Sequence, residues 1–195
     1  MMRNSILFIV LILFFSSCEK RNFFPDEDDP GLSRLTFHGY NIATAYINDV
    51  PYVNPYRHSI FGGGGNYRPA VKRFISNSDF DTLSISWLIE RNDTTGLYNT
   101  PFRNISLLMP VSKAFTIRDF IALRGKRFSS NTNVILLNSN VSDSIKGVSN
   151  LYFIKITDDA KYLTFSGLFD GNIGDSIKIT KGRFDFRIDV TDVNF

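Results

Sequence analysis

The sequence predicts an all-β fold, an antiparallel β-sandwich or barrel with one short helix. Two stretches carry the clearest signal, because apolar residues recur in them at every second position. Leu83, Ile85, Trp87 and Ile89 alternate with Ser84, Ser86 and Leu88, and Phe184, Phe186, Ile188 and Val190 alternate with Arg183, Asp185, Arg187 and Asp189. Successive side chains of a strand point to opposite faces, so this period indicates half-buried antiparallel strands. No strand–helix–strand rhythm accompanies them, which disfavours a parallel sheet.

The same reasoning gives a series of short strands separated by residues that favour turns. We expect strands at 34–40, 42–47, 50–54, 71–75, 83–89, 104–109, 133–138, 150–157, 161–169, 176–181 and 184–190. The turns come from Asn48-Asp49, Asn77-Ser78-Asp79, Asn92-Asp93, Asp158-Asp159 and the stretch from Gly171 to Asp175. Many short strands at this spacing are typical of a sandwich or a barrel.

One stretch favours a helix. Thr116 is followed three residues later by Asp119, which has the form of a capping box. Ile117, Phe120, Ile121 and Leu123 fall on one side, and Gly125 is placed to end the element. We therefore expect a helix of barely two turns.

The N-terminus has the pattern of a secretory signal peptide over residues 1–17. Arg3 supplies a positive charge, Ile6 to Phe15 is an unbroken apolar run, and the small residues Ser16-Ser17 precede Cys18. A run of this length rises only about 15 Å as a helix, roughly half of a bilayer core, which is too short for a stable span. The segment is therefore expected to be removed from the folded protein.

Cys18 is the single cysteine of the chain. The stretch Phe15-Ser16-Ser17-Cys18 resembles the lipobox of bacterial lipoproteins, which implies that Cys18 is lipidated and becomes the new N-terminus. Several acyl chains, at about 0.8 kcal/mol per buried methylene, hold a protein durably to a membrane. The sequence thus predicts a cell-envelope protein that is lipid-anchored to the outer membrane through Cys18. The alternative is an ordinary signal peptide that is cut nearby and leaves a free cysteine.

Residues 18–31 follow as a flexible tether, because they hold two prolines and the acidic run Asp26-Glu27-Asp28-Asp29 and have little apolar surface to bury. Surface-exported lipoproteins of Bacteroidota carry acidic residues after the cysteine, and this run is similar in kind. It lies eight residues downstream, so the outer surface and the periplasmic face both stay open. Residues 32–195 are then expected to form a single β domain.

Parts of the chain also resemble a group of small uncharacterised lipoproteins of Bacteroidota. The resemblance covers about a third of the chain: residues 152–157, the S-G-x-F stretch at 163–169, and the I-x-I-T-x-G-x-F-D stretch at 177–185. Residues 45–52 are similar to the opening of that group, with Asn48-Asp49 where Asn-Gly usually stands. The resemblance implies an exported β-protein whose C-terminal strands form a meander, and it implies no known activity.

No catalytic or metal-binding signature stands out. His38 and His58 are isolated in sequence, whereas a zinc site needs three or four ligands, and no G-x-S-x-G frame accompanies the serines. Asp185 and Asp189 share a strand face but are roughly 13 Å apart, too far for a glycosidase pair, so alternation with arginine indicates a solvated exterior. The net charge of +3 falls to about +2 without Arg3. This charge is too small to indicate a nucleic-acid-binding surface. We therefore predict no enzyme, no cofactor and no metal.

The most unusual local feature is the run Gly62 to Gly65. It is no phosphate loop, because Asn66-Tyr67-Arg68-Pro69 follows where a lysine and a helix are required. Aromatic, amide and guanidinium groups surround it and suit a sugar or a peptide. They form the candidate ligand-binding loop: Tyr56, Arg57, Gly63, Gly64, Asn66, Tyr67 and Arg68. The alternative is a plain mobile loop.

These observations favour a non-enzymatic binding module on a β scaffold, with an unknown glycan or protein partner. A structural or assembly component of the envelope, of the fimbrial type, is the alternative. An enzyme whose site residues are scattered along the sequence also stays open, since catalytic groups converge only in three dimensions.

Overall fold

The computed structural model describes residues 24–54, 69–92, 102–129, 132–139, 144–193 and 195. Its strands are β1 (Ile42–Ile47), β2 (Val50–Val53), β3 (Ala70–Phe74), β4 (Asp81–Leu88), β5 (Glu90–Arg91), β6 (Phe102–Val111), β7 (Arg127–Phe128), β8 (Val134–Ser139), β9 (Ser144–Asp158), β10 (Tyr162–Ile173) and β11 (Ile177–Asp189). The helix α2 (Ile117–Ile121) and a 3₁₀ turn, η1 (Val190–Asp192), complete the described elements. The all-β prediction is confirmed.

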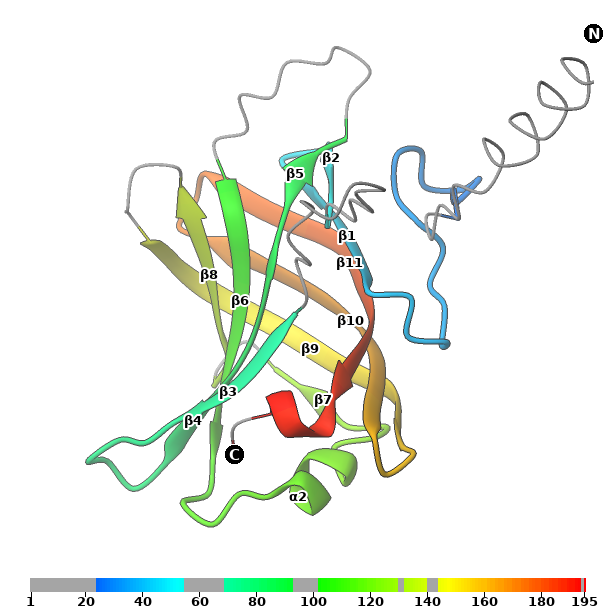
Figure 1. The fold of residues 1–195 in the computed structure, drawn as a ribbon. Coiled ribbons are helices and arrows are strands. Elements are labelled where there is room, and N and C mark those ends of the chain that lie inside the picture. The colour runs from blue at the N-terminus through cyan, green and yellow to red at the C-terminus, as the bar shows by residue number, and fades with distance from the viewer. Residues whose placement is uncertain (1–23, 55–68, 93–101, 130–131, 140–143, 194) are drawn as a thin grey trace, which may run out of the picture.

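All strands belong to one antiparallel sheet that curls into a half-barrel (Figure 1). Its order is β3-β4-β6-β8-β9-β10-β11-β1-β2-β5, with β7 paired to β9 off this path. β5, at one end of this order, is separated only by Ile89 from β4, which is the second strand from the other end. Of the two architectures that the sequence left open, the structure has the single curled sheet and not two stacked sheets.

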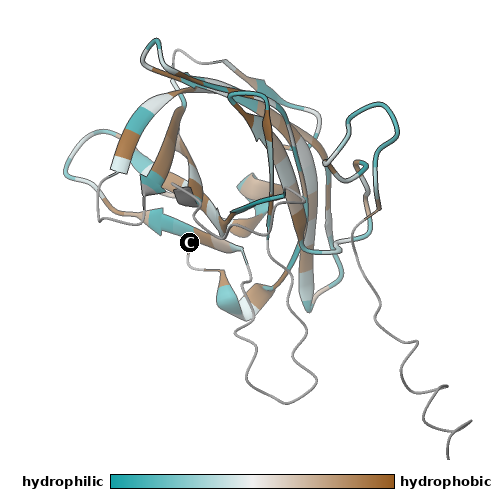
Figure 2. Cartoon of the chain, turned by 90° about the horizontal axis from the view of Figure 1, so that it is seen from above, coloured by the Kyte–Doolittle hydropathy of each residue, from teal (hydrophilic) through white to brown (hydrophobic). Residues whose placement is uncertain are grey.

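The inner face of the sheet is filled by aromatic side chains, which makes it a packed core. Trp87 lies 5.3 Å from Phe186 and 5.4 Å from Phe169 between ring centroids. Such pairs contribute about 0.5–1.5 kcal/mol each beyond the burial of their area. Seen from above, brown, apolar positions recur along the strands of the curled sheet (Figure 2).

Helix α2 lies at the lower end of the half-barrel in Figure 1 and inserts Phe120, which is fully buried, between Phe153 (5.6 Å) and Phe165 (5.3 Å). Its predicted capping box is confirmed, because the Thr116 backbone amide donates to Asp119 Oδ2 at 2.8 Å. The hydrogen bonds from the Thr116 hydroxyl and amide lower the pKa of Asp119. Gly125, with φ 74°, follows the helix as expected.

The predicted hairpin at Asn48-Asp49 is present, and both residues have positive φ, 50° and 62°. They therefore adopt the backbone of a type I′ turn, although Asp stands where Gly is usual. The stretches predicted as separate strands at 176–181 and 184–190 form one continuous strand, β11. The two-residue strands β5 and β7 were not predicted, since they are too short to show a period.

The predicted strand at 34–40 is wrong. Residues 24–41, which we call the strap, run without extended pairing over the outside of β1 and β11 (Figure 1). Asp185, expected on a solvated face, is in fact 1% exposed because the strap covers it. Among the described residues, none of the helices has both the length and the hydropathy to cross a bilayer.

Candidate functional site

The residues predicted from sequence as functional lie outside the described residues. Cys18 and the candidate loop residues Tyr56, Arg57, Gly63, Gly64, Asn66, Tyr67 and Arg68 are among them. Lipidation and ligand binding by that loop therefore stay predictions. The structure instead brings together two other surfaces, one on the strap and one beside β7.

The strap is held by a buried carboxylate. Asp185 accepts hydrogen bonds from the backbone amides of His38 (3.1 Å), Gly39 (2.8 Å) and Tyr40 (3.3 Å), and from the Thr36 hydroxyl. A carboxylate that accepts several backbone N–H groups is a strong anchor, because bonds to a charged acceptor are about twice as strong as neutral ones. The backbone amides of residues 38–40 therefore bond to this side chain, whereas in a strand at 34–40 they would have bonded to a neighbouring strand.

Ion pairs fasten the first part of the strap to β11. Arg183, whose side chain is 11% exposed, pairs with both Asp26 and Asp29, and Lys181 also pairs with Asp29. The Asp28 amide and Arg183 lower the pKa of Asp26, and Lys181 and Arg183 lower that of Asp29. The boundaries predicted at residues 17 and 31 stay predictions, but residues 24–31 of the expected tether make these contacts with the domain.

The strap carries the first surface, an open cavity of about 560 Å³ that we call the aromatic cup. Its rings are Phe24, His38 and Tyr40, with centroids 5.2 Å apart for Phe24 and Tyr40 and 5.5 Å for His38 and Tyr40. Pro25, Glu27, Arg34, Leu35 and Thr36 complete the lining. Phe24 is 40% exposed, so an apolar ring is presented to whatever fills the cup.

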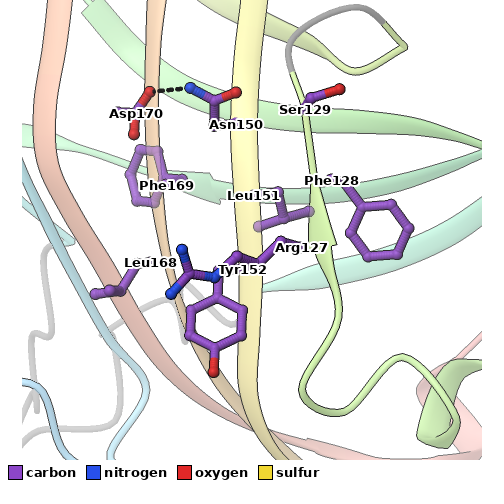
Figure 3. A pocket seen from close by; sticks show the side chains of 9 residues that line it. All are labelled: Arg127, Phe128, Ser129, Asn150, Leu151, Tyr152, Leu168, Phe169 and Asp170. Atoms are coloured by element: carbon purple, nitrogen blue, oxygen red, sulfur yellow. Dashed lines mark hydrogen bonds between the residues drawn. The ribbon is translucent and has the colours of Figure 1, made fainter.

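The second surface is an open cavity of about 510 Å³ between β7 and the outer side of β9 and β10, which we call the outer groove (Figure 3). Its floor is rigid, because it consists of paired strands. The Arg127 guanidinium lies 4.6 Å from the centre of the Tyr152 ring. Nearby, the Asn150 amide donates to Asp170 Oδ1 at 2.6 Å, and Leu168 is 39% exposed. The remaining lining residues are Phe128, Ser129, Leu151 and Phe169.

The outer groove combines few kinds of chemical group. Of the described residues that line the outer groove, only Asp170 carries a carboxylate, whereas acid–base hydrolysis of a glycosidic bond uses a pair. Within the described part of the chain, no three His, Cys, Asp or Glu side chains gather as a metal ion would need. What the groove offers is an aromatic ring, a cation and a hydrogen-bonded amide–carboxylate pair.

Sequence reasoning missed both surfaces. A signal for the outer groove was present, since Tyr152 and Leu168 are large side chains at positions that alternate out of phase with the buried Phe153 and Phe169. Large apolar residues on an outward strand face indicate a covered or binding surface. No protein-family model, curated protein or solved structure matches the chain.

Proposed function

We propose that the protein is a lipoprotein of the cell envelope, anchored to the outer membrane through Cys18, that acts as a non-enzymatic binding module for a glycan. The observation that carries the choice of ligand is the outer groove. A sugar ring has an apolar C–H face and hydroxyls that both donate and accept hydrogen bonds. The groove has both apolar side chains for the C–H face and polar side chains for the hydroxyls, all on paired strands.

The roles of the groove residues follow from their chemistry. Tyr152 and Leu168 provide apolar contact area for the face of a sugar ring. Asn150 donates to Asp170, which fixes the direction of the Asp170 carboxylate, whose oxygens can also accept from hydroxyls of a ligand. Arg127 adds donors that suit a hydroxyl or a carboxylate of an acidic sugar. A cavity of this volume falls in the range of small-ligand sites, about 300–1,000 Å³.

The test is binding of the purified protein to an array of defined oligosaccharides, followed by calorimetry on the strongest ligand. Tyr152→Ala and Asp170→Asn should each weaken binding at least tenfold without changing the thermal midpoint. Tyr162→Ala is the matched control, because Tyr162 also stacks with an arginine, Arg187 at 4.0 Å, but lies outside the groove. Equal losses in Tyr152→Ala and the control would remove the groove from the proposal.

Anchoring is tested separately by intact mass spectrometry of the protein extracted from membranes. A mass equal to residues 18–195 plus acyl chains supports lipidation at Cys18. Protease shaving of whole cells then distinguishes the outer surface from the periplasmic face. An unmodified mass would contradict the anchor while leaving glycan binding by the outer groove untouched.

An assembly role is the second candidate, and the hairpin between β3 and β4 favours it. Phe74, Ile75 and Phe80 at its end are 54%, 81% and 59% exposed. Among the described residues β3 pairs only with β4, so no described strand occupies its other edge, where a strand of another molecule could pair. Light scattering that shows concentration-dependent oligomers, abolished by Ile75→Asp, would support assembly. A monomer at all concentrations would argue against it.

A further inference from the structure

The strap lies close in sequence to the residue that is proposed to carry the lipid. Six positions separate Phe24 from Cys18, and six extended residues reach at most about 20 Å. If Cys18 is acylated, the aromatic cup therefore stays within that distance of the lipid surface. A surface held so near a membrane meets lipid at a high effective concentration.

The exposed side chains on the strap are of the kind that partitions into the membrane interface. Phe24 is 40% exposed in the cup and lies beside the ring of Tyr40, which in turn contacts the ring of His38. Aromatic rings with a polar tip concentrate at the headgroup level of bilayers, where one end is apolar and the other wet. The cup is open, so its apolar rings are available to lipid without rearrangement.

Three of the four carboxylates of the acidic run are in ion pairs, which reduces their repulsion of a lipid surface. Asp26 and Asp29 are paired with Arg183 and Lys181 and are only 17% and 13% exposed. On the rim of the cup Arg34, which is 56% exposed, pairs with Glu27, which is 87% exposed, at 2.9 Å, so these two charges offset each other. Asp185 fixes the backbone of residues 38–40, so the rings keep one orientation relative to the half-barrel.

We propose that the aromatic cup seats the domain on the phospholipid surface, with Phe24 in the interfacial layer. The inference rests on the proposed anchoring at Cys18 and deepens it. The acyl chains would hold the protein to the membrane, and the cup would set which wall of the half-barrel faces the lipid. The β3–β4 hairpin, on the other side of the molecule from the strap, then points away from the lipid (Figure 1).

The test uses the full acylated protein reconstituted into phosphatidylethanolamine–phosphatidylglycerol vesicles with brominated acyl chains, which quench tryptophan at short range. The single native tryptophan, Trp87, is 2% exposed in the core and gives a constant background. Phe24→Trp and, independently, His38→Trp place a probe in the cup on the strap. Phe74→Trp, at a phenylalanine on the β3–β4 hairpin that is 54% exposed, is the control.

We expect the two strap variants to lose most of their added fluorescence in brominated vesicles and Phe74→Trp to lose almost none. Near-UV circular dichroism matching the unmodified protein establishes that each variant is folded. If the strap variants are acylated and folded but are quenched no more than Phe74→Trp, the seating of the cup on lipid is overturned while the anchor at Cys18 stands. A mass spectrum of the same sample without acyl chains would overturn the anchor, and the cup's seating with it.

Discussion

Replacing Asp185 with Asn tests whether one buried carboxylate holds the strap on the sheet. The four hydrogen bonds that Asp185 accepts each contribute about 1.5–3 kcal/mol when the acceptor is charged, and about half of that when it is neutral. Asn keeps one acceptor oxygen and turns an NH₂ group toward donors on the other side. With half of each contribution lost, we expect the docking of the strap to weaken by about 3–6 kcal/mol, which is roughly a 160- to 25,000-fold rise in its opening equilibrium.

Amide hydrogen exchange is the assay, because the loss falls first on the strap and not on the whole fold. The backbone amides of His38, Gly39 and Tyr40 should lose protection by the stated factor in Asp185→Asn, while amides within β9 and β10 keep theirs. Asp175→Asn, in the exposed turn between β10 and β11, is the control and should change nothing. Unchanged exchange at residues 38–40 in the Asp185 variant would refute the reasoning that this carboxylate organises the strap.

Three further outcomes follow from the geometry. The pKa values of Asp26 and Asp29 are lowered in the folded protein. Their ion pairs therefore stabilise the docked strap above the ordinary pKa of 3.8, and this stabilisation is lost as the pH falls through the lowered values. Amide hydrogen exchange in the strap, measured from pH 5 to pH 2, should show a matching loss of protection. Gly39 has φ 72°, and a Cβ added there would lie 2.6 Å from a side-chain carbon of β11. Gly39→Ala should therefore lower the free energy of unfolding by about 1–3 kcal/mol, measured by thermal unfolding. Gly174→Ala should cost less, because φ is 56° there but no atom lies within 4 Å of the added Cβ. Asp49→Gly should raise the free energy of unfolding by about 0.4–1 kcal/mol in a denaturant titration, since glycine adopts φ 62° without strain.

The strands and the short helix could be predicted because their signals are local. Alternation over seven or more residues identified β4 and β11, and the capping box at Thr116 identified α2. The strap could not be predicted in this way, because residues 34–40 also alternate. Their backbone amides bond to a side chain about 145 residues away in sequence, and no local pattern encodes such a partner.

The outward faces of the strands show the same limit. The period of β11 assigns Asp185 to the outer side of the sheet correctly, but it says nothing of what covers that side. In the outer groove, Tyr152 was likewise identifiable as outward-facing, yet the groove exists only because β7 pairs beside β9. Two residues are too few to show a period, so the second wall of the groove was invisible in the sequence.

The strap and the outer groove lie on one wall, and this ties the two proposals together. Cross-strand partners run in a row from Arg183 on β11 through Leu168 on β10 and Tyr152 on β9 to Arg127 on β7. With neighbouring strands about 4.8 Å apart, that row spans roughly 14 Å from the strap's ion pairs to the far side of the groove.

A cup seated on lipid would hold the groove near the headgroups, and a lipid-linked ligand would then be captured at a high effective concentration. We expect an oligosaccharide attached to a vesicle lipid to bind the acylated protein at least tenfold more tightly than the same free oligosaccharide. Phe24→Ser should reduce this preference without changing affinity for the free sugar, because Phe24 lies outside the groove. Equal affinity for both forms would mean that the groove works independently of the membrane.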